Sequence, residues 1–276
     1  MDAFREHETG EVTSENSVID RSLVSSLLRP ASKTHPPTEE QLHPWCVGYS
    51  QTFDVPLLRI WDQRSGSRPD ANTCLMSRAP RQRLDTAESR RAFLATHIDH
   101  SNWTPTPFIS FTTSATAVTD LADMRENRKR GAQHLTAIDP NIRLAAGLPI
   151  LDFSAEANYY NIADPYGKSN QYCKDHYLCL WEVSGREIVR QWDWDDLAVH
   201  WNWYDEIVMP AFRKFRSEFV SKSLRNESSD LSTAIGKLSR QLAISQRQNT
   251  LKADGVSYKQ FIQPRLSLCW RFGQPK

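Results

Sequence analysis

The chain has 276 residues, of which 39% are hydrophobic and 24% charged, the usual balance of a globular protein with a buried core. It has no apolar run near the roughly 18 residues of a membrane helix, no signal-peptide pattern, and no CxxC pair among its five cysteines. The net charge of +1 hides a basic C-terminal end, because residues 212–276 hold 13 Lys and Arg against 4 Asp and Glu. We therefore expect a cytoplasmic protein without membrane contact, metal site or disulfide framework. Its basic end either binds a polyanion or docks on the acidic body.

The first 40 residues are rich in Glu, Ser, Thr and Pro, which predicts a flexible N-terminal segment. Within it, residues 17–28 have the pattern of a short amphipathic helix that docks on the body or on a partner. Residues 41–211 are expected to form the folded body. Residues 212–276 are expected to form a basic helical extension packed on that body.

The body alternates short apolar runs with helical patterns. Strands are predicted at 55–61, 108–111, 134–140, 147–153 and 176–183. Helices are predicted at 86–98, at 115–130 and from about 194 onward, the last one interrupted by Pro210. Asp85 with Glu88 and, further on, Ser114 are the expected N-caps, and 62–72 and 154–172 are expected loops. This order predicts a single α+β domain built on a mixed sheet.

An arginine interrupts the first apolar run. Burying the guanidinium of Arg59 costs free energy unless the group is paired or holds an anion. It is therefore either an anion anchor or the partner of Asp62 or Asp54.

Hydroxyl groups gather where the strand at 108–111 meets the next helix. Helix N-termini have free N–H groups, so Ser110, Thr112, Thr113 and Ser114 could bind a phosphate or a ribose. Plain capping of the helix accounts for Ser114 alone.

An acidic and aromatic run, WDWDDLAVHWNWYDEIV, spans residues 192–208. Carboxylates beside indole faces suit a guanidinium ligand. The alternative is an amphipathic helix with tryptophans inward and acids outward. A short His97-x-Asp99-His100 motif also occurs, but its spacing does not indicate a metal site.

Arg59, Ser110 and the strand at 176–183 occur in an order that resembles the ADP-ribosyltransferase toxins. That family has an arginine on a first strand, Ser-Thr-Ser on a second and a glutamate on a later one. LLRIWDQR resembles the first element and FISFTTSATAV the second, with Phe111 where the pattern has a small residue. The glutamate position, counted back from VSGREI, falls on His176. The resemblance thus implies the fold of that family, but not its activity unless Glu182 or Glu206 replaces the glutamate.

A wider similarity, over about residues 50–210, is to an intracellular fungal family with the segments RxWDxxSGSR, HxDxSNxTPTPFIS and YLxxW. These segments are residues 59–68, 97–110 and 177–181. The group is identified as one that includes the fungal arginine-containing cyclodipeptide synthases, which join arginine to a second amino acid taken from aminoacyl-tRNAs.

The resemblance implies a synthase of secondary metabolism that forms a cyclo(Arg-Xaa) diketopiperazine without a cofactor. Aminoacyl-tRNAs, including arginyl-tRNA, would be its partners, and the basic end suits their phosphates. The expected base is His176 or Glu206, and the expected nucleophile or ester anchor is Ser110 or Thr112. Asp196 and Asp205, beside Trp203, are expected to bind the guanidinium, and Arg59 an anion. The alternatives are an ADP-ribosyltransferase that uses NAD, and a degenerate relative that binds a nucleotide or RNA without turnover.

Overall fold

The computed structural model describes residues 19–30, 37–45, 52–70, 74–167 and 175–221. A six-stranded sheet lies at its centre in the order β5-β6-β3-β1-β4-β8, and all its paired strands are antiparallel. The sheet consists of β1 (Leu57–Asp62), β3 (Phe108–Thr112), β4 (Gln133–Ile138), β5 (Ile150–Asp152), β6 (His176–Leu180) and β8 (Ile188–Asp193). A smaller sheet pairs β2 (Leu75–Met76) with β7 (Glu182–Val183).

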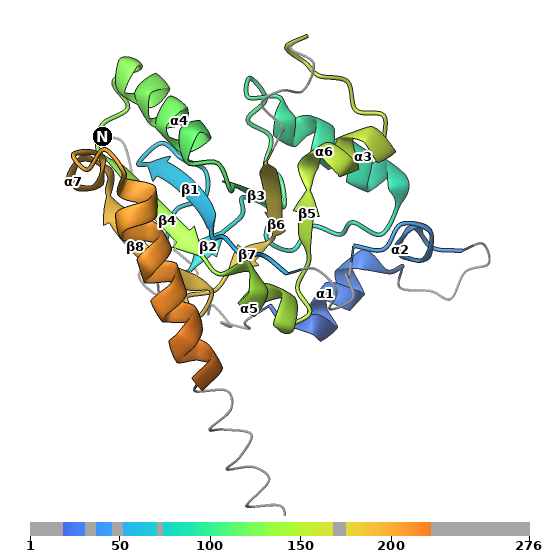
Figure 1. Cartoon of the computed structure of the whole chain (residues 1–276). Helices are drawn as coiled ribbons and strands as arrows, with labels where there is room; N and C mark the ends of the chain where they lie inside the picture. The colour runs from blue at the N-terminus through green and yellow to red at the C-terminus, as the bar shows by residue number, and fades with distance from the viewer. Residues whose placement is uncertain (1–18, 31–36, 46–51, 71–73, 168–174, 222–276) are drawn as a thin grey trace, which may run out of the picture. The chain divides into compact units, whose positions relative to one another are not determined.

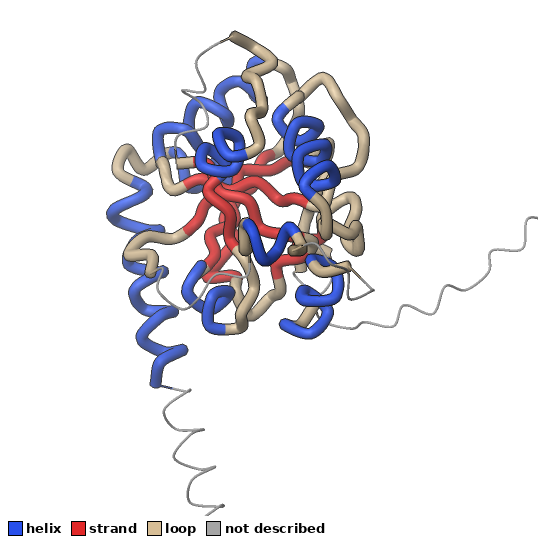
Figure 2. Tube along the Cα trace, turned by 90° about the vertical axis from the view of Figure 1, so that its right-hand side faces the viewer, coloured by secondary structure: helices blue, strands red, loops and turns tan. Residues whose placement is uncertain are grey.

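Helices surround the sheet in both views (Figures 1 and 2). They are α1 (Arg21–Leu28), α2 (Glu39–Leu42), α3 (Ala87–Ile98), α4 (Ala115–Asn127), α5 (Pro140–Ala145), α6 (Phe153–Tyr159), α7 (Trp194–Ala198) and a π-helical turn at Tyr204–Val208. The predicted single α+β domain is confirmed.

The two faces of the sheet have separate cores because side chains alternate along each strand. On β3, Phe108 belongs to a core shared with α1, α3 and α6, whereas Ile109 and Phe111 belong to a core with β2, β5 and β7. Leu58 lies on the first face and packs with α4, α7 and the π turn. Ser110 shares that first face with Phe108.

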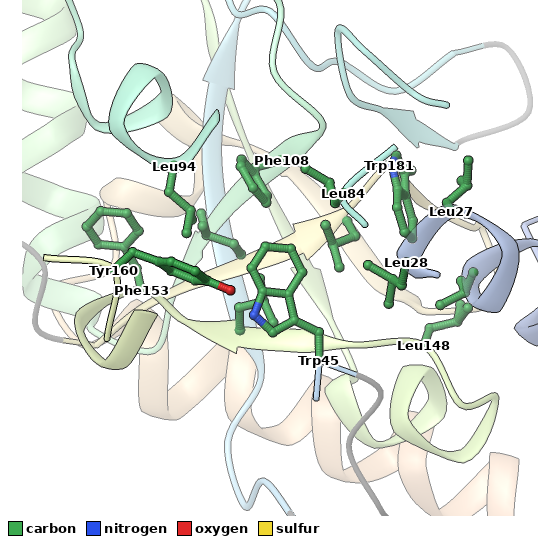
Figure 3. Packing of buried hydrophobic residues seen from close by; sticks show 14 of the residues in the cluster. Leu27, Leu28, Trp45, Leu84, Leu94, Phe108, Leu148, Phe153, Tyr160 and Trp181 are labelled. Carbon is green, nitrogen blue, oxygen red and sulfur yellow. The ribbon is translucent and has the colours of Figure 1, made fainter. Parts of the chain in front are cut away.

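The N-terminal segment is more ordered than its composition predicts. Residues 21–28 form α1, and the side chains of Val24 and Leu28 are fully buried. Leu28 packs in the core beside Trp45 and Trp181 (Figure 3). The expected amphipathic helix is therefore present and docks on the body, because its apolar face completes a core that the sheet leaves open. The flexible segment predicted for 1–40 is wrong for this helix and for α2; residues 1–18 and 31–36 lie outside the described part.

β1 and β3 are neighbours, but only Leu58 and Thr112 form a register pair. By contrast, β1 pairs with β4 along its whole length from Leu57 to Asp62. The two central strands therefore diverge beyond Leu58, and the carbonyl groups of β3 on that side need other donors.

Most predicted elements are found, with shifted ends. The N-cap of α3 is Thr86, which forms a capping box with Ser89, and not the expected Asp85. Ser114 caps α4 as predicted, by accepting a hydrogen bond from the Ala117 N–H. The strand expected at 176–183 is divided at Trp181, whose φ of 59° is a left-handed conformation that a continuous strand does not allow.

The chain divides into two compact units, Met1–Arg216 and Ser217–Lys276. In the first unit, helical residues continue after the π turn, and Pro210 has no N–H for the carbonyl of Glu206 four residues earlier. In the second unit, residues 217–221 are helical. The predicted packing of residues 222–276 on the body lies outside the described residues.

Candidate active site

Three positions singled out by the sequence lie on three adjacent strands. Arg59 is on β1, Ser110 on the neighbouring β3, and His176 on β6, the next strand in the sheet. Across β3 and β6, Thr112 pairs with His176 and Ser110 pairs with Leu178. Antiparallel partners share a face, so Ser110, Thr112 and His176 project on the same side.

Ser110 has a histidine partner that the sequence analysis set aside. The Ser110 Oγ lies 2.7 Å from His97 Nε2, and His97 Nδ1 lies 2.8 Å from the Oγ1 of Thr106, whose side chain is buried. His97 comes from the last turn of α3, and its ring packs edge-on against Phe108 with 5.4 Å between centroids. The array has the layout of a nucleophile, a base and a group that orients the base.

No sequence signal identifies this pair. His97 had been considered only as part of a metal motif, and among the described residues the structure has no group of three potential metal ligands. The contact depends on how α3 crosses β3, which neither the helical nor the strand pattern specifies.

The histidines of the site are held in their neutral form. Burial, followed by the charges of His176 and Arg59, lowers the pKa of His97 well below its usual value. Burial, with His100 and Arg59, lowers the pKa of His176 to about 4. None of these perturbing groups is a carboxylate. At neutral pH both rings therefore have a lone pair available to accept a proton.

Arg59 is bound to the backbone and not to an acid. Its Nη1 donates to the Ser110 carbonyl at 3.0 Å, and its Nη2 donates to the Ser67 carbonyl at 3.1 Å. The guanidinium thus supplies donors in the gap where β1 and β3 diverge. Burial is the main cause that lowers its pKa to about 10, and Asp62 acts in the opposite direction through its charge.

The expected ion pair of Arg59 needs correction. Asp62 accepts from the Nη2 of Arg130 at 2.9 Å, and Asp54 lies 4.0 Å from Arg216. Neither aspartate forms the expected ion pair with Arg59. The two bonds from Arg59 to backbone carbonyls use two of its five N–H donors, and its Nε is a buried atom without a hydrogen-bond partner.

The other hydroxyls at the start of α4 are used locally. Thr112 Oγ1 accepts the Ser114 N–H at 3.0 Å, and Ser114 Oγ accepts the Ala117 N–H at 3.1 Å. Capping therefore accounts for Thr112 as well as Ser114. Of the two candidate nucleophiles, Ser110 is the one with a base beside it.

The acidic and aromatic run is separate from this site. Trp203 is buried and packs edge-on against Trp194 at 5.4 Å, whereas Asp196, Asp205 and Glu206 are exposed. The run belongs to α7 and the π turn, and α7 packs against β4 and β8. β8 is three strands from β3 in the sheet, or about 14 Å.

The amphipathic alternative for this run is therefore the one that the structure supports. The packed tryptophans face inward, because burial of their large apolar surface stabilises the core. The carboxylates stay at the surface, where water hydrates them. Glu206 is exposed on the π turn, and no hydrogen bond joins it to Ser110, His97 or His176 in the described part of the chain.

Glu182, the other stand-in for a missing glutamate, lies on β7 and pairs with Met76 in the small sheet. It is not on the strand that carries His176. The carboxylate that the NAD alternative needs beside Ser110 is thus not found among the described residues around it.

No helix in the described ranges is long and apolar enough to cross a membrane. Comparison with known proteins gives one match, to a domain of unknown function, DUF7587, over residues 56–197. No curated protein and no solved structure matches the chain. The matched residues are more than half of the chain and include β1, α3, β3 and β6, so the strands and the helix that form the site all belong to the domain. The chain therefore belongs to the DUF7587 family.

Proposed function

We propose that the protein is an acyltransferase that uses aminoacyl-tRNA, with Ser110 as nucleophile and His97 as general base, and that it forms a cyclo(Arg-Xaa) diketopiperazine. The observation that carries this proposal is the 2.7 Å contact between the Ser110 hydroxyl and His97 Nε2. A hydroxyl at this distance from a neutral imidazole is the arrangement that serine acyltransferases require.

The first half-reaction loads the enzyme. Ser110 Oγ attacks the carbonyl carbon of the aminoacyl ester while His97 Nε2 takes the hydroxyl proton. The tetrahedral intermediate collapses, the ester C–O bond breaks, and the ribose oxygen of the tRNA leaves with the proton that His97 returns. An aminoacyl ester is already activated, so even a weak base such as a buried histidine suffices.

The second half-reaction builds the ring. The free amine of a second aminoacyl-tRNA attacks the acyl group on Ser110, which releases the serine and leaves a dipeptidyl-tRNA. The N-terminal amine of this dipeptide then attacks its own ester and expels the second tRNA. His176, neutral and on the same face as Ser110, is the second group able to accept a proton from an incoming amine.

The tautomer of His97 decides which way the proton moves. A ring protonated at Nδ1 donates to Thr106 Oγ1 and leaves Nε2 to accept from Ser110, and both distances, 2.8 and 2.7 Å, suit this pattern. Thr106 is then the residue that positions the base. The low pKa of His97 agrees with a neutral ring.

The tRNA and the arginine rest on other grounds than the Ser110 contact. The 13 basic residues against 4 acidic ones in 212–276 suit a phosphate backbone. Arginine comes from the family resemblance alone, because the acidic run expected to hold it faces away from the body core. The cytoplasm, where aminoacyl-tRNAs occur, is the compartment in which we place the reaction.

The NAD alternative is weaker because no carboxylate in the described part of the chain is hydrogen-bonded to Ser110, His97 or Arg59. An oxocarbenium-like ribosyl transition state carries positive charge, and the charge of Arg59 near Ser110 would oppose it. A binding protein without turnover would not need a base aligned with a serine. The geometry thus favours acyl transfer over both rivals.

Incubation of the full-length protein with labelled arginyl-tRNA and a mixture of other aminoacyl-tRNAs tests the proposal. We expect a labelled diketopiperazine from the wild type, none from Ser110→Ala, and wild-type yield from Ser26→Ala, a hydroxyl deletion on the remote helix α1. A parallel incubation with NAD should give no nicotinamide. Nicotinamide release without diketopiperazine would restore the ADP-ribosyltransferase, and binding of tRNA without either product would identify a non-catalytic relative.

A further inference from the structure

An open hollow lies at the C-terminal end of β1, on the face of the sheet opposite Ser110. Its volume is about 420 Å³, and its lining residues are Trp61, Gly66, Arg68, Pro69, Asp70 and Met76. This volume falls in the range of small-molecule sites, about 300–1,000 Å³. The acyl transfer proposed above assigns no role to it.

The loop that forms one wall is fixed by hydrogen bonds from several directions. Asp62 Oδ1 accepts the Arg64 N–H at 2.8 Å and an Arg130 N–H at 2.9 Å. The Ser67 carbonyl accepts from Arg59, and Arg68 Nη1 donates to the Gln63 carbonyl at 2.8 Å. The hollow is therefore shaped before any ligand arrives, which reduces the entropy that binding must overcome.

One wall of the hollow is flat and aromatic. The Trp61 indole is held by a 2.9 Å hydrogen bond from its Nε1 to Thr136 Oγ1, and one side of it packs against His134 at 4.6 Å. Met76, which is 47% exposed, adds a thioether. Gly66 contributes no side chain to this wall, and a Cβ at this position would come within 2.7 Å of the Arg78 side chain.

The charge beside the hollow is slightly positive. Its lining contains Arg68 and Asp70, the Arg59 and Arg78 side chains reach the same loop, and Glu182 pairs with Met76 of the lining. Burial is the main cause that lowers the pKa of Arg59 to about 10, and the charge of Asp62 acts in the opposite direction. An anionic ligand would relieve this excess, whereas an arginyl side chain would add to it.

A flat aromatic wall beside an exposed guanidinium is the combination that binds a nucleotide. Bases stack on tryptophan whatever their sequence, and arginine binds phosphate through its planar fork. We propose that the hollow is a mononucleotide site, in which a purine base stacks on Trp61 and its phosphate is bound by Arg68. The Asp70 carboxylate lies in the same lining and could accept a ribose hydroxyl.

The same chemistry could come from a free nucleotide or from an unpaired nucleotide of an RNA. Adenosine monophosphate carries the shared groups, so it is the first probe, by isothermal titration calorimetry on the full chain. Parallel titrations with NAD and with a short single-stranded RNA ending in CCA distinguish a free nucleotide from an unpaired RNA nucleotide. Adenosine, inorganic phosphate and arginine methyl ester test the base, the phosphate and a cation separately.

We expect AMP to bind more tightly than adenosine or phosphate alone. Trp61→Leu and Arg68→Gln should each weaken AMP binding by about tenfold or more. Arg64→Gln is the matched control, since Arg64 is exposed on the same loop but does not line the hollow, and its affinity should equal that of the wild type. Circular dichroism identifies a Trp61 variant that fails to fold, and Arg68→Gln then carries the test.

No AMP binding by the wild type, equal weakening in Arg64→Gln, or binding of arginine methyl ester in place of AMP would each overturn this site. The result is independent of the acyl transfer. AMP binding without diketopiperazine formation would support the nucleotide site and contradict the proposed function. Diketopiperazine formation without AMP binding would support the proposed function and contradict the nucleotide site.

Discussion

His97 and Ser110 lie 13 positions apart in the sequence and meet through a contact between helix α3 and strand β3. Their hydroxyl–imidazole distance of 2.7 Å, with Thr106 on the far side of the ring, is the geometry on which the proposed role of His97 as base rests. At this scale the sequence predicts Ser110 as a candidate nucleophile, but it predicts His176 or Glu206, and not His97, as the base. Glu206 is exposed on the π turn, and His176 faces the same side as Ser110 but, in the described part of the chain, forms no hydrogen bond with it.

Replacing His97 should therefore damage the reaction more than replacing any other histidine. We expect His97→Gln to slow the loading of Ser110 by about 10²–10⁴-fold, the usual loss when a general base is removed. Stopped assays with arginyl-tRNA measure the rate, and His200→Gln, a change at an exposed histidine, is the control. An unchanged rate would mean that the amine or the solvent acts as base.

The rate should also lack an inflection near neutral pH. An ordinary histidine would give one, but burial lowers the pKa of His97 well below its usual value and that of His176 to about 4. Both are thus already neutral at pH 6.5, and the loading rate should be level from there upward.

At the scale of elements, the divergence of β1 and β3 places special demands on Arg59. One guanidinium donates to the carbonyls of Ser110 and Ser67, which holds the nucleophile strand and the loop after β1 together. The ammonium of a lysine is compact and does not have the planar fork that reaches both.

We expect Arg59→Lys to lower the free energy of unfolding by roughly 2 kcal/mol, since hydrogen bonds from charged donors contribute about 1.5–3 kcal/mol. Loading of Ser110 should fall as well, because the strand that carries it loses a support. Urea unfolding is the measurement, with Arg64→Lys on the exposed part of the same loop as control. Normal stability with lost activity would indicate that Arg59 binds an anion.

Helix α1 is the element that composition predicted least well. Its flanks are polar, its first turn has no acidic residue and its last turn no basic one, yet Leu28 is fully buried against the core around Trp45 and Trp181. We expect Leu28→Ala to cost about 2–5 kcal/mol of unfolding free energy. Leu42→Ala, at a leucine that is 61% exposed, should cost less than 1 kcal/mol by the same urea titration. Equal, small effects would place α1 outside the cooperative fold.

Sequence patterns specify local secondary structure better than they specify the contacts between elements. The strands β1, β3 and β6 can be predicted because their apolar residues alternate or are consecutive. Helix α4 can be predicted because Ser114 is a typical N-cap. α6 and β8 were missed because polar residues and short lengths leave no clear period. The Ser110–His97 pair could not be predicted, since it depends on the angle between two elements and not on the pattern within either.

At the scale of the whole molecule, two buried neutral histidines make stability depend on pH. In the unfolded chain a histidine titrates near 6.5, but in the folded protein the pKa of His176 is lowered to about 4. As the pH falls from 6.5 towards 4, the unfolded state binds a proton that the folded state does not. The free energy of unfolding therefore decreases over this window, by up to about 3 kcal/mol for His176, and is unaffected by this group above it.

Thermal unfolding between pH 4 and 7 measures this effect. We expect His176→Gln to reduce the loss of Tm on acidification, whereas His134→Gln, at a partly exposed histidine of β4, should retain the wild-type slope. A slope that is the same in all three proteins would mean that His176 is not held neutral by the fold.

The central claim is that Ser110 carries an acyl group during turnover. Full-length protein is mixed with arginyl-tRNA, quenched in acid within the first turnover, and analysed by intact-protein and peptide mass spectrometry, with Ser110→Ala and His97→Gln in parallel. We predict one arginyl group on the peptide that contains Ser110 in the wild type, little in His97→Gln at the same time point, and none in Ser110→Ala. A diketopiperazine formed without any adduct, or an adduct on another residue that persists in Ser110→Ala, would contradict the account.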